Sequence, residues 1–290
     1  MSLEKKSPCK VNLLLNILGK RVDGFHELET VMQPVKVFDE LSFERVASGI
    51  QLTCSDVTLP TDSGNLVYRA ASVFLQQAKI KDGVKIHLQK NIPLAAGLGG
   101  GSGNAATTLL GLNDLFAYPL AAQVLHELAA ALGSDIPFFL QTQPALATGR
   151  GENIKSLAPF PALRDASIIL AHPGFGISTA WSYQSLARFP EALNGKPGCA
   201  QKLISLLETA DLKAAGKEFY NSLETPALEK YPLLVLFQEF FCANGADATL
   251  MSGSGSTTFA LIQGQPAAEQ LVEKFKSKFG ETCWTAAVPL

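Results

Sequence analysis

The stretch at residues 91–113, NIPLAAGLGGGSGNAATTLLGLN, decides the fold, because a glycine-rich loop leads there directly into a predicted helix. From Ser102 onward, apolar residues recur at helical spacing, at Ala105, Leu109, Leu112 and Phe116. A strand is predicted just before the loop, at 84–88. Strand, glycine loop and helix start together gather free backbone N–H groups at the positive end of a helix dipole. Such an arrangement binds anions, and above all phosphate.

The residues that follow the glycines exclude two familiar phosphate loops. A Walker A loop needs a Gly-Lys-Ser/Thr ending, and no lysine follows here. The dinucleotide fingerprint needs a third glycine where Ser102 stands. The segment is therefore a phosphate loop of a third kind, or else a glycine-rich turn without a ligand. Glycines favour the first interpretation, because side chains would keep phosphate oxygens away from the backbone.

The composition describes a globular chain with room for a large core and two lobes. Of its 290 residues, 47% are hydrophobic and 17% are charged, which is far from the composition of a disordered chain. The net charge of −2 gives no electrostatic reason to expect nucleic acid or an anionic membrane as a partner. No apolar run approaches the roughly 18 residues of a membrane span.

The cysteines and histidines predict neither a disulfide framework nor a zinc site. Five scattered cysteines form no CxxC pair, namely Cys9, Cys54, Cys199, Cys242 and Cys283. The four histidines offer no HxxxH spacing. We therefore expect a reduced, cytoplasmic protein. No acidic cluster stands out, so the sequence does not identify metal ligands.

The first half of the chain is predicted to hold strands followed by helices. Strands are expected at 8–18, 30–37, 39–45 and 50–54. Helices are expected at 65–78, capped from Ser63 or Asn65, and at 120–132, ended by Gly133. Ser134 then has the character of an N-cap for a further helix, with Asp135 in its first turn.

The second half is predicted to be an α+β lobe rather than a parallel doubly wound sheet. Strands are expected at 167–171, 246–251, 258–262 and 282–286. Helices are expected at 180–187, 200–215, 223–228, 232–243 and 267–279. We expect two domains, residues 1–158 and 159–290.

Three polar features allow both a structural and a functional interpretation. Lys10 and Asn12 share one face of the first strand, since side chains alternate along a strand. They belong either to an edge strand with a wetted face or to a site. The turn at 21–26, RVDGFH, is either a solvated hairpin connection or a site with an aromatic ring and an imidazole. Asp135 either stabilises a helix dipole or acts in catalysis.

Six segments in family order resemble the GHMP small-molecule kinase superfamily, named for galacto-, homoserine, mevalonate and phosphomevalonate kinases. They are SPCKVNL at 7–13, DGFHEL at 23–28, PLAAGLGGGSGNAA at 93–106, LGSDIPFF at 132–139, TGRG at 148–151 and MSGSGSTTF at 251–259. They span nearly the whole chain, so the resemblance is far more specific than a lone glycine loop. It is closest to the branch that phosphorylates the 2-hydroxyl group of a cytidyl diphosphate sugar alcohol in the non-mevalonate route to isoprenoids.

The resemblance implies a two-lobe α+β GHMP kinase with its active site in the inter-lobe cleft, using ATP and Mg²⁺, as a monomer or homodimer. The family's catalytic pair corresponds to Lys10 and Asp135. ATP is expected on the loop and helix start, at Pro93, Leu94, Ala95, Ala96, Gly97, Leu98, Gly99, Gly100, Gly101, Ser102, Gly103 and Asn104. The substrate is expected at Asn12, Phe25, His26 and Thr179. The turn at 252–256 is expected to pack under the glycine loop.

Three residues depart from the family pattern. Cys9 stands where Ala is common, which is expected to change packing only. Gly103 stands where a second Ser is usual, so a hydroxyl contact to phosphate or metal is missing there. Phe25 replaces the more usual Tyr, so its ring can stack on a base but makes no hydroxyl contact.

The chemistry of phosphoryl transfer agrees with these roles, because it depends on positioning and charge stabilisation. Asp135 is expected to accept the proton of the acceptor alcohol late in the reaction. Lys10 is expected to orient that acid or the acceptor oxygen, to keep the acid ionised and to offset charge on the γ-phosphate. Two alternatives stay open. A kinase acting on mevalonate or homoserine is disfavoured by the DGFHEL turn, and a non-catalytic binding module by the joint presence of Lys10, Asp135 and the loop.

Overall fold

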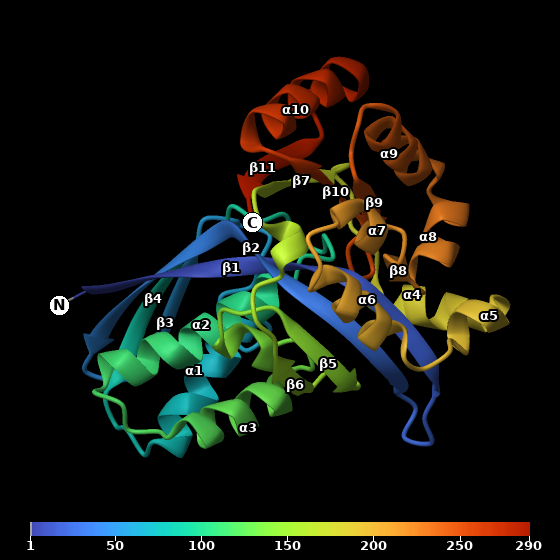
Figure 1. Ribbon diagram of the computed structural model, residues 1–290. Coiled ribbons are helices and arrows are strands. Elements are labelled where there is room, and N and C mark those ends of the chain that lie inside the picture. The colour runs from blue at the N-terminus through green and yellow to red at the C-terminus, as the bar shows by residue number, and fades with distance from the viewer. Residues whose placement is uncertain (1) are drawn as a thin grey trace. The chain divides into compact units, whose positions relative to one another are not determined.

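The computed structural model describes residues 2–290 and contains two compact units built from interleaved segments (Figure 1). Unit 1 comprises the chain up to Cys9 together with Val37–Ile92 and Gly99–Thr142. Unit 2 comprises Lys10–Lys36, Pro93–Leu98 and Gln143–Leu290. The glycine loop therefore passes from unit 2 into unit 1 at Gly99. The domain boundary expected at residue 158 stays a prediction.

Two long strands, β1 (Ser2–Lys20) and β2 (His26–Val46), contribute residues to both units. The predicted break between strands at 30–37 and 39–45 is wrong, because β2 continues through Asp39. The prediction left only Phe38 between the two strands and began the second strand at Asp39. The side chain of Asp39 is fully buried within β2 and accepts the N–H groups of Asn91 and Ile92.

Unit 1 is a sheet with helices on one face. β2 pairs antiparallel with β4 (Gly83–Gln89), which pairs in parallel with β3 (Ile50–Cys54). Side chains along β4 alternate between buried and exposed, as a half-buried strand requires. The helices α1 (Leu66–Gln77), α2 (Gly100–Leu115) and α3 (Ala122–Leu132) gather on the buried face (Figure 1).

Helix boundaries in unit 1 follow the predicted caps until the end of α3. The Asn65 side chain accepts the N–H of Val67 and so caps α1 as predicted. The helix expected after Ser134 is wrong, because residues 134–136 form a turn before the short 3₁₀ helix η1 (Pro137–Leu140). Four residues cannot sustain an α-helix in isolation. Burial of the rings of Phe138 and Phe139 holds the segment instead.

In unit 2, β1 is an inner strand of its sheet. It lies between β2 and the two-residue strand β8 (Tyr220–Asn221), which pairs with it in parallel. β5 (Ala145–Gly149) pairs with β2 and with β6 (Asn153–Ser156). The side chains of Lys10 and Asn12 are 3% and 4% exposed. The interpretation of β1 as an edge strand with a wetted face is therefore wrong.

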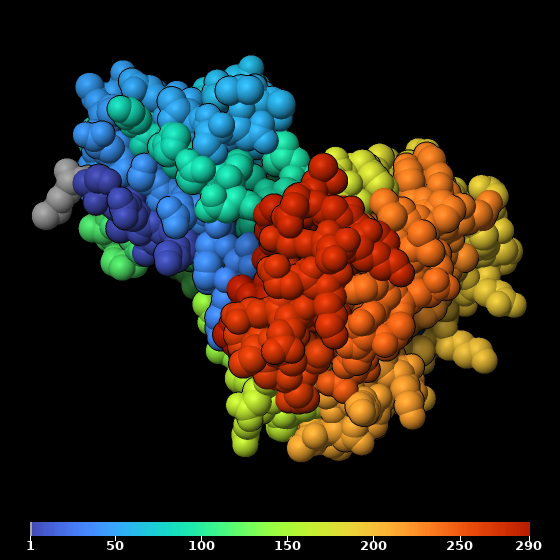
Figure 2. All heavy atoms as spheres, turned by 90° about the horizontal axis from the view of Figure 1, so that it is seen from above, coloured from blue at the N-terminus to red at the C-terminus, as the bar shows by residue number. Residues whose placement is uncertain are grey.

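A second sheet of unit 2 is antiparallel, in the order β11-β7-β10-β9. Its strands are β7 (Ala166–His172), β9 (Ala248–Met251), β10 (Thr258–Gln263) and β11 (Trp284–Pro289). The helices α9 (Pro232–Ala243) and α10 (Gln265–Phe279) pack on it through phenylalanine rings. Figure 2 shows the red α10–β11 segment beside the orange residues that include α9.

Shorter helices complete unit 2. They are α4 (Thr179–Ser185), α5 (Pro190–Leu193), α6 (Cys199–Leu207), α7 (Leu212–Gly216), α8 (Glu224–Lys230), η2 (Pro161–Leu163) and η3 (Leu186–Arg188). The single helix expected at 200–215 is wrong, because Asp211 ends the run by capping α7 at the N–H of Ala214. Within residues 2–290, the longest and most apolar helices are still too short or too polar to cross a membrane.

Candidate active site

The glycine loop turns through left-handed backbone conformations before α2 begins. Ala95, Gly97 and Gly99 have φ values of 50°, 76° and 69°. Gly99 is the N-cap of α2, so the helix starts two residues earlier than the apolar pattern predicted. A side chain is excluded at Gly97 on steric grounds as well, since its Cβ would lie 2.0 Å from the carbonyl oxygen of Ser252.

The turn at 252–256 packs directly on this loop, as predicted. The hydroxyl of Ser252 donates to the carbonyl oxygen of Gly97 at 3.0 Å. The N–H of Thr257 donates to the carbonyl oxygen of Ala96 at 3.2 Å. Because β9 and β10 form a tight antiparallel pair on either side of the turn, the loop rests on a rigid support.

Lys10 is held against the same loop by its neighbours on unit 2. Its ammonium donates to Asn12 Oδ1 at 2.5 Å and to the carbonyl oxygen of Gly97 at 3.1 Å. Asn12 in turn donates from Nδ2 to the hydroxyl of Thr30 at 2.8 Å. The hydrogen bond between Lys10 and Asn12 confirms that the two side chains share one face of β1. The structure thus brings together Lys10, Asn12 and Gly97 from the expected site.

On the unit 1 side, a buried polar network holds the start of α2. Asn104 donates from Nδ2 to Asp39 Oδ2 at 2.9 Å and to Ser7 Oγ at 3.1 Å. The ammonium of Lys90 donates to Asn104 Oδ1 at 3.2 Å and forms an ion pair with Asp39. The side chain of Asn104 is therefore fully engaged inside the protein. Sequence reasoning missed Asp39 and Lys90, although a lysine just before the loop was a signal.

Gly103 packs so closely against β1 that no side chain would fit between them. A Cβ at this position would lie 2.7 Å from the carbonyl oxygen of Pro8 and 3.0 Å from the hydroxyl of Ser7. The ring of Phe139 closes the third side at 3.5 Å. The departure from Ser at this position therefore permits close packing of α2 on β1.

The turn expected to read the substrate base makes one cation–π contact and one aromatic pair, both within unit 2. Phe25 is 51% exposed, and the guanidinium of Arg150 lies 4.7 Å from its ring centroid. The rings of His26 and Tyr183 are tilted to one another with centroids 4.9 Å apart. Burial, with a smaller contribution from the charge of Lys20, lowers the pKa of His26. Sequence reasoning did not identify Arg150 or Tyr183 as partners of this turn.

Thr179 lies exposed at the first position of α4, where its hydroxyl shares a hydrogen bond of 3.0 Å with the hydroxyl of Ser254. The turn at 252–256 therefore contacts both the glycine loop and an expected substrate residue.

Asp135 lies half-buried in the turn before η1, in unit 1, whereas Lys10 belongs to unit 2. The pairing of their head groups stays a prediction.

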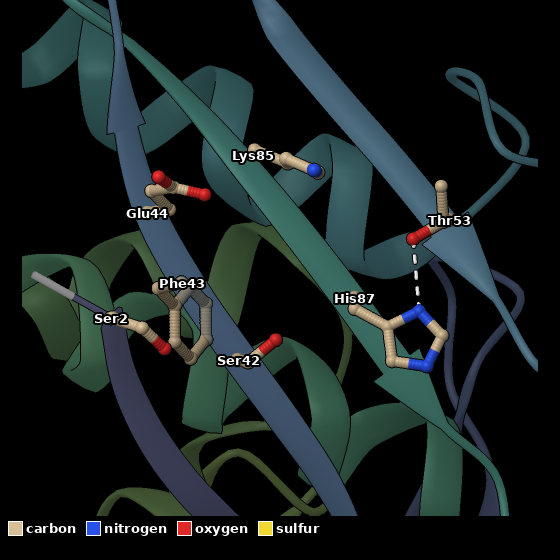
Figure 3. A pocket seen from close by; sticks show the side chains of 7 residues that line it. All are labelled: Ser2, Ser42, Phe43, Glu44, Thr53, Lys85 and His87. Carbon is tan, nitrogen blue, oxygen red and sulfur yellow. Dashed lines mark hydrogen bonds between the residues drawn. The ribbon is translucent and has the colours of Figure 1, made fainter.

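Two surface hollows lie apart from these residues. One, of about 390 Å³, is on the open face of the unit 1 sheet, where Figure 3 shows Thr53 hydrogen-bonded to His87, with Ser42 and Lys85 to one side of the pair. The other, of about 1010 Å³, is in unit 2 beside α5 and the start of α6. None of the expected site residues lines either hollow. Among residues 2–290, no three His, Cys, Asp or Glu side chains cluster as a metal site.

Two family models match the chain, "GHMP kinases N terminal domain" at residues 65–143 and "GHMP kinases C terminal" at 203–281. The chain is 37% identical to a 4-diphosphocytidyl-2-C-methyl-D-erythritol kinase of Syntrophotalea carbinolica, over 94% of each chain. It is 40% identical to the protein of the same name from Syntrophus aciditrophicus, over 91% of each.

Solved structures agree. The chain is similar to a crystal structure of 4-(cytidine 5'-diphospho)-2C-methyl-D-erythritol kinase, with a TM-score of 0.82, 35% identity, and coverage of 99% of this chain and 100% of the other. A homoserine kinase from Cytophaga hutchinsonii shares the fold at a TM-score of 0.77 and 20% identity, over 99% and 93% of the two chains. The predicted family resemblance and the α+β GHMP kinase fold are confirmed.

Proposed function

The chain belongs to the GHMP kinase family, and we propose that it transfers the γ-phosphoryl group of ATP to the 2-hydroxyl group of 4-diphosphocytidyl-2-C-methyl-D-erythritol. Members of this family are ATP-dependent kinases, and the near full-length relatives carry the name of this activity. The observation that carries the proposal is the ammonium of Lys10, buried and bonded to the carbonyl oxygen of Gly97 in the phosphate loop.

The chemistry assigned to this chain is proton transfer and charge stabilisation. As the acceptor oxygen bonds to the γ-phosphorus, the bond from that phosphorus to the bridging oxygen of ADP breaks. The alcohol proton passes to the carboxylate of Asp135. The ammonium of Lys10 balances negative charge on the transferring group and orients the acid. ADP and the phosphorylated alcohol leave, and Asp135 returns its proton to water.

Magnesium fits this site although the chain offers no acidic cluster among residues 2–290. Mg²⁺ in kinases is held largely by the phosphate oxygens and water, with one or two protein oxygens. The half-buried hydroxyl of Ser102 in the first turn of α2 is the side-chain oxygen nearest in sequence to the loop's N–H groups. When bound, the ion neutralises charge that develops on the phosphates.

The cytidine end of the substrate is assigned to the rings of Phe25 and His26 in unit 2. Phe25 offers an exposed ring for stacking, backed by the guanidinium of Arg150. The lowered pKa of His26 keeps its imidazole neutral near pH 7, so it can offer one donor and one acceptor to a base edge. Asn12 and Thr179 are assigned to the remainder of the substrate. Cytoplasmic location, a two-lobe division near residue 158 and a monomer or homodimer belong to the same proposal.

An ADP-release assay over three acceptors tests the proposal. Activity is expected with the cytidyl diphosphate methylerythritol acceptor and not with mevalonate or homoserine, since those lack a base for the aromatic turn. Asp135→Ala is expected to lower turnover by about 10²–10⁴-fold with little change in ATP affinity. Asp114→Ala, which alters an acid whose side chain is 27% exposed, is the matched control. Near-normal turnover of the Asp135 variant, or equal use of mevalonate, would contradict the assignment.

A further inference from the structure

Asn221, on the two-residue strand β8, joins that strand to the turn beneath the glycine loop. Its side chain is 1% exposed. Both N–H groups of its amide donate, to the carbonyl oxygens of Met251 and Gly253, each at 2.8 Å. Its Oδ1 accepts the N–H of Leu223 at 2.9 Å. One amide thus grips two carbonyl groups that lie on either side of Ser252.

The turn that the Asn221 amide holds, at residues 251–253, lies beside the ammonium of Lys10. The space beside the Cα of Gly253 is bordered by the Lys10 Nζ at 3.3 Å, the Asn12 Oδ1 at 3.4 Å and the Gly97 carbonyl oxygen at 2.9 Å, measured from where a Cβ would stand. The neighbouring Ser252 donates its hydroxyl to that same carbonyl oxygen. A shift of this turn would therefore move the acceptor to which Lys10 is bonded.

β8 is fixed to the strand that carries Lys10. Asn221 lies opposite Leu15 in the parallel pairing of β8 with β1. The N–H of Ser222 donates to the carbonyl oxygen of Leu15 at 2.8 Å, and its hydroxyl accepts the N–H of Ile17 at 3.0 Å. These contacts run from β1 to β8, through the amide of Asn221 to the turn at 251–253, and back to Lys10 on β1, all within unit 2.

We propose that Asn221 is a positioning residue for phosphoryl transfer, which holds the turn at 251–253 so that the ammonium of Lys10 keeps its place at the glycine loop. The inference rests on the function proposed for Lys10. The ionisable groups that contact residues 251–256 are Lys10, near Gly253, and the buried Glu224, whose carboxylate accepts the N–H of Met251 at 2.9 Å. A third is His172, whose Nδ1 shares a hydrogen bond of 3.2 Å with the hydroxyl of Ser256.

Asn221→Asp separates positioning from mere packing, because the two side chains have the same shape. An ionised carboxylate has no hydrogen to donate and would face two carbonyl oxygens, whereas a protonated carboxyl can donate to one of them. We expect turnover at pH 8 to fall by about 10–100-fold relative to the parent. Turnover of Asn221→Asp should recover as the pH is lowered and the carboxyl at position 221 is protonated. The pH profile of the parent should show no such rise.

The matched control is Asn244→Asp, the same chemical change at an amide that bonds the carbonyl oxygen of Phe240 in unit 2, away from the turn. It should leave turnover and its pH profile unchanged. Hydrogen exchange of the peptide spanning 252–257 is measured on the same samples. At pH 8 it should be faster in Asn221→Asp than in the parent or the control.

The outcomes separate the two proposals. A parent protein with no transferase activity on any acceptor would overturn the proposed function. The exchange rates would then still test whether Asn221 holds the turn at 251–253. Parent-like turnover and exchange in a folded Asn221→Asp protein would overturn the positioning role. If that variant does not fold, Ser252→Ala replaces it, because it removes the bond from the turn to Gly97. Turnover of Ser252→Ala equal to the parent's would likewise overturn the role.

Discussion

Replacing Asp39 with alanine tests the buried network that holds both ends of the glycine loop. Its carboxylate is fully buried and accepts from the ammonium of Lys90, the amide of Asn104 and the backbone N–H groups of Asn91 and Ile92. Asn91 and Ile92 lead from β4 into the loop, and Asn104 lies in the helix that leaves it. The substitution therefore releases the loop on both sides at once.

The expected loss of stability follows from the groups that Asp39→Ala leaves without a partner. The Lys90 side chain is only 6% exposed, so Asp39→Ala leaves an ammonium buried without its counter-ion. Breaking a buried pair on one side costs about 3–5 kcal/mol. Two orphaned backbone N–H groups add about 1–3 kcal/mol each where water cannot reach them. Because the groups share one network the terms do not add fully, and we expect a loss of about 4–6 kcal/mol.

Urea unfolding of the parent and variant measures this loss, with Asp114→Ala as the control. Asp114 pairs with Lys5 in the same unit, but both side chains are about one-third exposed, so its removal should cost under about 1 kcal/mol. Adding Lys90→Met to Asp39→Ala should restore part of the stability, since no unpaired charge then stays buried. A loss below about 1 kcal/mol for Asp39→Ala, or no recovery in the double variant, would refute the reasoning.

Two further predictions concern packing and pH. Gly103→Ala should destabilise unit 1 by about 1–3 kcal/mol, because its Cβ would crowd the Pro8 carbonyl oxygen, whereas Gly101→Ala, with 3.7 Å of clearance, should lose nothing in the same urea titration. Burial lowers the pKa of His172 to about 4, so the folded state binds fewer protons than the unfolded state below about pH 6.5. Stability should therefore fall by about 2–3 kcal/mol between pH 6.5 and 4. His172→Gln should remove that part of the pH dependence, and an unchanged slope would contradict the assignment.

Local patterns predicted the parts of the fold whose signals lie close together in sequence. The glycine loop, the start of α2 nearby and the cap of α1 at Asn65 depend on neighbouring residues, and the structure has them close to where the sequence placed them. Lys10 and Asn12 were placed on one face because strand alternation fixes it, and their hydrogen bond confirms it.

The missed features depend on partners that are far apart in the chain. The role of Asp39 was not predicted, since nothing near it in sequence shows that Lys90 and Asn104 complete its bonding. The sequence around Asn221 gives no signal of its role, because its two acceptors lie about thirty residues later. A polar residue inside an apolar run is thus ambiguous until its distant partner is known.

The hydrogen bonds of the glycine loop explain why its N–H groups suit an anion. Three successive carbonyl groups accept from the protein, namely those of Ala96, Gly97 and Leu98, whose donors are Thr257, Lys10 with Ser252, and the backbone of Lys10. In a trans peptide the N–H points opposite to the C=O. Anchoring these carbonyl groups therefore turns the N–H groups of residues 97–99 away from their protein supports, which is the orientation that a phosphate requires. The lysine assigned to catalysis is thus also one of the groups that shapes the cradle, and changing it should disturb ATP binding as well as transfer.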